Sequence, residues 1–164
     1  MSAADLAAPV QVSGPHPARL WHLPGLLVVL WSFTRATPWL PVTRSRLMDA
    51  RLMAVMIRRG EVRVMCAGLR PVAFIARDGA YIKALYVLPA LQGQGTGSRL
   101  LTEAQEQTTV LELFTHVRNA GARGFYARAG FTEAEGSLEN DERVPDLRLI
   151  WQRGGPMATG WTGA

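Results

Sequence analysis

Apolar positions near the start of the chain recur with the period of an α-helix. Four residues follow the i, i+3, i+4, i+7 spacing of one helix face: Leu27, Leu30, Trp31 and Thr34. Pro38 and Pro41 would end this helix, because proline has no backbone N–H to donate. The pattern therefore predicts a first helix that packs one face on a core.

A second helical pattern follows, with Thr43 as a candidate N-cap and Gly60 at its end. We expect its apolar positions to include Met48, Leu52, Val55 and Met56. The other faces carry Arg44, Arg46, Arg51, Arg58 and Arg59. The pattern predicts an amphipathic helix with a strongly basic outer surface.

Alternating apolar and polar residues replace the helical pattern after Gly60. Three short strands are predicted, over about 61–66, 72–76 and 81–87. Asp78-Gly79 is a strong hairpin turn between the second and third of them, since glycine accepts the positive φ that tight turns need. A weaker strand candidate lies at 10–12.

Helical and strand patterns alternate in the second half of the chain. A helix is predicted to begin near Thr96, with one face formed by Gly97, Leu100, Leu101 and Ala104. A strand over 110–117 leads to another helix, with a stripe of Ala122, Phe125, Tyr126 and Ala129 that stops at Gly130. Strands over 131–135 and 147–151 complete the pattern.

The composition is that of a globular protein with one domain. The chain has 164 residues, of which 48% are hydrophobic and 19% charged. Residues 1–20 are rich in Ala, Pro and Gly, and we expect them to be poorly ordered apart from the first strand. Residues 21–152 would form the domain, and 153–164 a flexible tail.

Charge and cysteine usage narrow the function classes. The formal net charge of +5 favours an anionic partner, which a nucleotide cofactor or a nucleic acid would equally satisfy. With Cys66 as the single cysteine no intrachain disulfide can form, and the three histidines are too scattered for a metal site. The apolar run over 23–31 is too short to span a bilayer. We therefore expect a cytoplasmic protein that has no membrane partner.

The segment 87–101 carries the most chemistry. Gly93, Gly95 and Gly97 lie between a predicted strand and a predicted helix start. Glycines allow close approach to the backbone, and a helix start offers unpaired N–H groups, so together they suit a pyrophosphate. A flexible turn is the alternative interpretation. The loop lacks the Gly-Lys-Ser/Thr ending of a P-loop and the acidic residue of a dinucleotide fingerprint.

A second motif, Asn119-Ala-Gly-Ala122-Arg-Gly-Phe125-Tyr126-Ala-Arg-Ala-Gly130-Phe131, follows the next strand. With the Gln92-x-x-Gly95-x-Gly97 loop, it resembles the paired motifs of the GNAT superfamily of N-acetyltransferases. The resemblance runs from about 61 to 151, and the segments 35–41 and 140–148 look similar to parts of one bacterial subgroup. It implies an α/β fold of the α+β type, with a mixed, mostly antiparallel sheet of six to seven strands and about four helices.

The resemblance also implies a reaction, the transfer of an acetyl group from acetyl-CoA to a primary amine by direct attack. Its cofactor-binding residues would be Leu85, Tyr86 and Val87 for the pantetheine arm, Gln92, Gly93, Gln94, Gly95, Thr96, Gly97 and Ser98 for the pyrophosphate, and Asn119, Phe125 and Tyr126 around them. An amide near Val87 would polarise the thioester oxygen. Dimerisation is common in this superfamily, so a homodimer is a candidate assembly.

Tyr126 would be the general acid that protonates the leaving thiolate. A phenol of pKa about 10 is protonated at neutral pH and can donate to a thiolate, whose thiol has a pKa of about 8.5. The competing interpretation is a core aromatic, because Tyr126 lies on the apolar stripe of its helix. Arg99, Arg123 and Arg128 could meet the cofactor phosphates, or could equally be exposed helix residues.

The general base is where this sequence departs from the superfamily pattern. Many relatives carry an acidic residue or histidine in the strand before the loop, where this chain has Lys83 and Ala84. Substitute bases are Glu112, His116, Glu142 and Asp146, and a water chain could also serve. Two other functions stay open: a degenerate relative that binds acyl-CoA without turnover, and a basic nucleic-acid-binding domain.

Overall fold

The computed structural model describes residues 9–39, 44–134 and 146–155. Within these ranges seven strands form one sheet in the order β1-β2-β3-β4-β5-β7-β6. Neighbouring strands are antiparallel, except β4 and β5, which are parallel. The strands are β1 (Val12–Pro17), β2 (Val62–Ala67), β3 (Arg70–Asp78), β4 (Tyr81–Val87), β5 (Val110–His116), β6 (Thr132–Ala134) and β7 (Asp146–Gln152).

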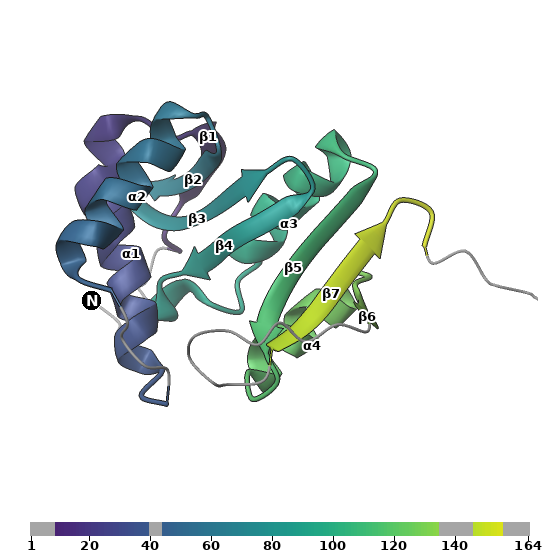
Figure 1. Cartoon of the computed structure of the whole chain (residues 1–164). Helices are drawn as coiled ribbons and strands as arrows, with labels where there is room; N and C mark the ends of the chain where they lie inside the picture. The colour runs from purple at the N-terminus through teal and green to yellow at the C-terminus, as the bar shows by residue number, and fades with distance from the viewer. Residues whose placement is uncertain (1–8, 40–43, 135–145, 156–164) are drawn as a thin grey trace, which may run out of the picture.

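Helices cover both faces of this sheet (Figure 1). One face is covered by α1 (Leu23–Ala36) and α2 (Arg46–Arg58), and the other by α3 (Thr96–Gln107) and α4 (Ala120–Arg128). Two short 3-10 turns, η2 (Leu20–His22) and η3 (Pro89–Leu91), precede α1 and α3. A mixed, mostly antiparallel sheet with four α-helices is the predicted fold, and this prediction is confirmed.

Side chains of β3 alternate between two apolar cores. Ala73 and Ile75 belong to the core under α3 and α4, whereas Phe74 and Ala76 belong to the core under α1 and α2. Because successive residues of a strand point to opposite faces, a strand buried on both faces reads as a continuous apolar run. The predicted turn between β3 and β4 is present, with Gly79 at φ 56° between the paired residues Asp78 and Tyr81.

The first strand lies later in the chain than the sequence pattern predicts. The prediction was 10–12, whereas β1 covers Val12–Pro17 and pairs with β2. Its register shifts between Ser13 and His16, and Gly14 has φ 117°. A bulge and a proline break the two-residue period that marks a strand, and both are tolerated here because β1 is an edge strand.

The prediction for the buried face of α2 is wrong for three of its four residues, and only Met56 packs against the core. Met48, Leu52 and Val55 are 45%, 39% and 41% exposed, whereas Met53 and Ile57 are buried. The helix is held in this rotation by α1, because Trp31 Nε1 donates to Asp49 Oδ2 at 3.0 Å and the Arg46 guanidinium lies 4.8 Å from the centre of the Trp31 ring. Thr43, the predicted cap, lies outside the described residues. Ser45 caps α2 by accepting from Met48 N at 3.2 Å.

Candidate active site

The site is built on a divergence between β4 and β5. These parallel strands pair only where Tyr81 lies opposite Glu112, with Glu112 N donating to Ala80 O at 2.8 Å. Beyond that point the strands separate toward their carboxyl ends, as Figure 1 shows. Backbone groups on the facing edges are therefore available to a ligand instead of being paired within the sheet.

The pairing of β4 with β3 decides which of its backbone groups face the opening. Leu88 N donates to Val72 O at 2.9 Å, and Tyr86 lies opposite Phe74. In an antiparallel ladder alternate residues turn their backbone groups to the partner strand, so those of Leu85 and Val87 point into the opening. The Val87 carbonyl accordingly accepts from Gln92 Nε2 at 3.2 Å.

Tyr86 contributes a side chain to the site rather than backbone groups. Its ring lies 4.5 Å from that of Phe33 on α1 and 5.7 Å from that of Phe74, measured between ring centres. The sequence predicted backbone contacts for all three of Leu85, Tyr86 and Val87. The observed register makes Leu85 and Val87 the residues whose backbone groups are open.

The glycine loop leads into α3 without a side-chain cap. Gly93 and Gly95 have φ values of 77° and 84°, and Gly95 is the N-cap of the helix. The first helical amide that bonds back is that of Arg99, which donates to Gly95 O at 3.0 Å. The amides of the preceding turn are therefore open, at the positive end of the helix dipole.

Neighbouring side chains hold the loop in shape. Gln94 Nε2 donates to Ala90 O at 3.3 Å, which adds to the bond between Gln92 and Val87. Thr96 is buried, while Ser98 is exposed beside the loop. A Cβ at Gly97 would lie 3.4 Å from both Phe125 Cζ and Val87 Cγ2, so the absence of a side chain lets α3 start close to β4 and α4.

The second motif forms α4 and buries Tyr126 in the core against which Leu85 and Val87 of β4 also pack. Asn119 is the N-cap, and its Oδ1 accepts from Ala122 N at 3.1 Å. Tyr126 is only 7% exposed and packs edge-on against Phe125 and Phe131. Burial, and to a smaller extent the nearby Tyr86, raises the pKa of the Tyr126 phenol well above its usual range. Tyr126 is thus a core aromatic that also keeps its proton at neutral pH.

Two of the three arginines considered for phosphate contacts are engaged elsewhere. The Arg99 guanidinium donates to Val12 O and Gly14 O of β1 at 2.9 and 2.8 Å. Arg123 donates to Val117 O and pairs with Glu133 at 2.7 Å. Arg128, exposed in the last turn of α4, makes no contact of this kind with the described residues.

The candidate bases differ in what surrounds them. Lys83, which stands where many relatives carry a base, is engaged in an ion pair, with Nζ 2.7 Å from Glu61 Oε2. Glu112 accepts from Arg148 at 2.8 Å, and this hydrogen bond lowers the pKa of its carboxyl, which makes it a weaker base. Glu142 lies outside the described residues. His116 and Asp146 come together, with Nδ1 of the ring 3.0 Å from Oδ1 of the carboxylate.

Trp39 brings the chain that follows α1 to the end of β5. Its ring meets that of His116 edge-on at 5.3 Å. The Arg118 guanidinium also contacts Trp39, 5.7 Å from the ring centre. The sequence placed Trp39 in a segment, 35–41, that resembles the substrate-side helix end of one bacterial subgroup. It could not say which distant strand this end touches, because a helical pattern carries no such information.

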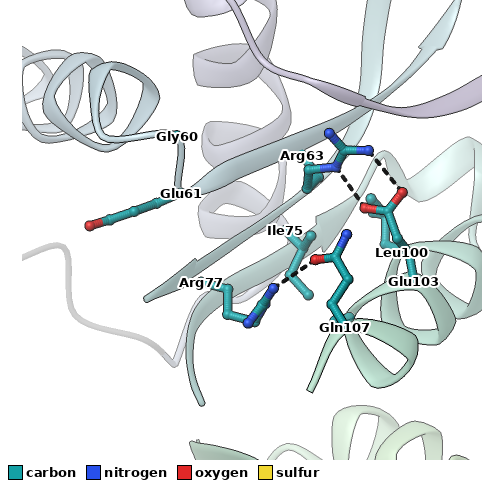
Figure 2. A pocket seen from close by; sticks show the side chains of 9 residues that line it. Gly60, Glu61, Arg63, Ile75, Arg77, Leu100, Glu103 and Gln107 are labelled. Carbon is teal, nitrogen blue, oxygen red and sulfur yellow. Dashed lines mark hydrogen bonds and ion pairs between the residues drawn. The ribbon is translucent and has the colours of Figure 1, made fainter. Parts of the chain in front are cut away.

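A small cavity lies elsewhere, between α3 and strands β2 and β3 (Figure 2). Its volume is about 60 Å³, and its polar side chains bond to one another. Arg63 binds Glu103 at 2.6 and 2.9 Å, and Arg77 binds Gln107 at 2.8 Å. A cavity of this size, whose polar groups satisfy one another, is a feature of packing rather than a substrate site.

Cys66 is a core residue. It is buried under α1 and α2, and burial raises the pKa of its thiol, which makes it a poor nucleophile at neutral pH. No cluster of metal-ligating side chains is found in the part of the chain that the structure describes. Over the same residues, none of the helices has the length and apolarity needed to cross a bilayer.

Comparisons with known proteins agree with this geometry. The acetyltransferase (GNAT) domain profile matches residues 51–133, which is half of the chain. The peptidyl-lysine N-acetyltransferase YjaB of Salmonella typhimurium is 33% identical over 84 residues, and the match spans 49% of this chain and 57% of that relative. The chain thus spans little more than half the length of this curated relative.

Solved structures of the same family share the fold. YjaB of Escherichia coli in its apo form superposes with a TM-score of 0.69 at 22% identity, covering 89% of this chain and 98% of that one. The PaiA N-acetyltransferase of Thermoplasma acidophilum, in complex with coenzyme A, gives a TM-score of 0.66 at 16% identity, with 88% and 99% covered. The family uses acetyl-CoA as its acyl donor. The profile match, supported by this likeness of fold, shows that the chain belongs to the GNAT family of acetyltransferases.

Proposed function

We propose that this chain transfers the acetyl group of acetyl-CoA to a primary amine, which attacks the thioester directly. The observation that carries the proposal is the opening between β4 and β5. At this opening the open backbone edge of β4 leads into the uncapped start of α3, and Tyr126 of α4 lies beneath. Membership of the GNAT family supports the same reaction class.

The residues of the loop fit an anionic cofactor. The open amides of Thr96, Gly97 and Ser98 face outward from the first turn of α3, where the helix dipole favours negative charge. Gly93 and Gly95 adopt positive φ, so no side chain stands between the backbone and a phosphate. Arg128 would add a positive charge from α4.

Acetyl-CoA supplies an activated acyl group as a thioester, and the chain supplies orientation and protons. The Val87 N–H points into the opening, where it can donate to the oxygen of the reacting carbonyl. Tyr126 holds a proton throughout the neutral range and would donate it to the sulfur as the C–S bond breaks. Transfer from a phenol of raised pKa is uphill in isolation, so it must coincide with the collapse that expels the thiolate.

The acceptor amine is best sought among lysine side chains. The YjaB relative is a peptidyl-lysine N-acetyltransferase, and it is 33% identical to this chain over 84 residues. Phe33, Tyr86 and Trp39 provide an apolar border on which the methylene stem of a lysine could lie. A small polyamine has the same primary amine on an unbranched stem and is the natural second probe.

A protein that binds acyl-CoA without turnover is the second candidate, because Lys83 and Ala84 stand where relatives carry a base. A nucleic-acid-binding function is less well supported. Its arginines on α2 are exposed, yet they alternate with exposed Met48, Leu52 and Val55, which a phosphate backbone would not contact. Salt-dependent binding of DNA or RNA would revive that function.

Thermal melting with and without acetyl-CoA is the first test. A ligand at about 100 times its dissociation constant stabilises a protein by roughly 2.7 kcal/mol, which raises the melting temperature of a domain this size by several degrees. Thiol release with a lysine-containing peptide and with a polyamine then tests turnover. A rise in melting temperature without thiol release would favour the non-catalytic binder, and no rise at millimolar acetyl-CoA would contradict the proposal.

A further inference from the structure

We propose that the outward face of α2 is a docking surface for an acidic amphipathic helix of a partner protein. This α2 docking face consists of an exposed apolar row and of two exposed arginines beside it: Met48, Leu52 and Val55, with Arg51 and Arg58. The proposal goes beyond the acetyl transfer proposed above and does not depend on it, because this face takes no part in the opening between β4 and β5.

The apolar row has the spacing of a helix–helix seam. α2 already packs on the core through Met53 and Ile57, so the exposed row is a second apolar stripe that the core does not need. Its residues Met48, Leu52 and Val55 are separated by four and then three positions. This is the a/d spacing at which side chains of one helix fit between those of another. The row therefore suits a helical partner better than an extended or a flat one.

The two arginines stand where a paired helix would carry its interhelical charges. Arg51 directly precedes the seam residue Leu52, and Arg58 follows Arg51 by one heptad, so both occupy the g position of the same pattern. Both side chains are exposed, and no carboxylate of the described residues forms an ion pair with either of them. Glutamate or aspartate at the matching positions of a partner helix would complement these charges.

The acidic residue of α2 does not neutralise this face. Asp49 Oδ2 accepts from Trp31 Nε1 at 3.0 Å, on the side of α2 that contacts α1. At the end of the helix Arg59 approaches Glu61 at 3.9 Å, but its side chain remains 65% exposed and adds to the positive charge. The docking face thus presents apolar and positive groups together, and its complement is a surface that is apolar and acidic.

Other occupants fit these features less well. If two copies of α2 paired antiparallel about a two-fold axis, the g positions would meet each other, which sets Arg51 and Arg58 against the arginines of the second copy. A nucleic-acid backbone would contact the arginines and leave the apolar seam uncovered. An anionic bilayer would accept both kinds of side chain but is fluid, so it gives no reason for a regular spacing of four and three.

The test uses two synthetic peptides of about 21 residues, because shorter isolated helices are marginal in water. Both carry leucine at the a and d positions; one carries glutamate and the other lysine at e and g. Fluorescence anisotropy at low salt should show that wild type binds the acidic peptide at least about tenfold more tightly than the basic one. The preference should reverse in Arg51→Glu/Arg58→Glu. It should persist in Arg35→Glu/Arg70→Glu, a control with the same change of net charge at two exposed arginines of α1 and β3.

Binding is measured without acetyl-CoA, so the result is separate from that of the acetyl-transfer assay. Equal binding of the two peptides by wild type, or an unchanged preference in Arg51→Glu/Arg58→Glu, would overturn the proposal. A dimer in sedimentation velocity, or binding to phosphatidylglycerol vesicles, that this double variant abolishes would also overturn it, because the face would then belong to a second copy or to lipid. If the glutamate variant fails to fold, Arg51→Gln/Arg58→Gln replaces it and should weaken binding of the acidic peptide alone.

Discussion

Replacing Gly95 with valine tests the pyrophosphate site most directly. Gly95 has φ 84°, and a Cβ there would have no heavy atom within 4 Å. The substitution therefore causes no clash inside the protein, and its cost is the positive φ, which amounts to about 1–3 kcal/mol for a non-glycine residue. A valine side chain would also project into the space that a phosphate would occupy.

The effect on the cofactor should be much larger than the effect on stability. Hydrogen bonds to charged groups contribute about 1.5–3 kcal/mol each, so losing two loop amides weakens binding by more than about a hundredfold. Gly60→Val is the matched control, because Gly60 has φ 72°, has equally open surroundings and lies at the end of α2. Calorimetry with acetyl-CoA should show binding by Gly60→Val and none by Gly95→Val, although both variants melt at a lower temperature than wild type.

This comparison separates strain from recognition. Equal loss of acetyl-CoA binding in both variants would mean that any strained glycine disturbs the site through global stability. Normal binding by Gly95→Val would refute the assignment of the loop, since neither the backbone bend nor the open space at position 95 would then matter.

Three further predictions follow from the site and from α2. Tyr126→Phe should keep acetyl-CoA binding and lower kcat by about 10²- to 10⁴-fold, measured by thiol release; an unchanged kcat would exclude Tyr126 as the acid. Because burial raises the pKa of the Tyr126 phenol, its contribution to stability should be complete below the unfolded phenol pKa of about 10 and be lost as pH rises above that value. The urea midpoint of wild type should therefore fall relative to that of Tyr126→Phe only in strong alkali. If the exposed row on α2 is a homodimer interface, Leu52→Glu should convert dimer to monomer in sedimentation velocity, and an unchanged sedimentation coefficient would exclude that surface.

Local patterns predicted most elements because their signals are short-range. β4 begins and ends where the alternation does, and α3 begins at Thr96, directly after the glycines that close the loop. The turn at Asp78-Gly79 needs only one residue with positive φ. In each case the information lies within a few residues, so one sequence is sufficient to find the element.

The buried face of α2 shows where such patterns fail. Two rows of apolar residues run along this helix, one through Met48, Leu52 and Val55 and the other through Met53 and Ile57. The first row has more large side chains, and on hydrophobicity alone it is the better candidate for burial. The rotation is decided instead by contacts with Trp31, which lies on another helix. A helix that offers two apolar rows cannot be oriented without its partner.

The residues of the candidate site also divide into those that a local motif identifies and those that only the fold brings together. The loop glycines, Asn119 and Tyr126 are each part of a local motif, and the sequence alone singled them out. The pairing of His116 with Asp146 depends on a register between strands that are 30 positions apart, with α4 and β6 between them in the chain. The sequence put His116 forward with Glu142 as a candidate base, but it could not pair His116 with Asp146, because the spacing of single residues carries no record of which strands will be neighbours.

The residues that would hold acetyl-CoA and those on the acceptor side come from different elements, so substitutions could change one set without the other. The amides that would hold acetyl-CoA come from β4 and α3, whereas His116, Asp146 and Trp39 come from β5, β7 and the end of α1. Within the sheet the two sets are separated by the opening, because β4 and β5 pair only where Tyr81 lies opposite Glu112. Substitutions on the acceptor side should therefore alter the rate and the choice of amine while leaving acetyl-CoA binding in place, so that one cofactor site can serve a different acceptor whenever β7 and the end of α1 change.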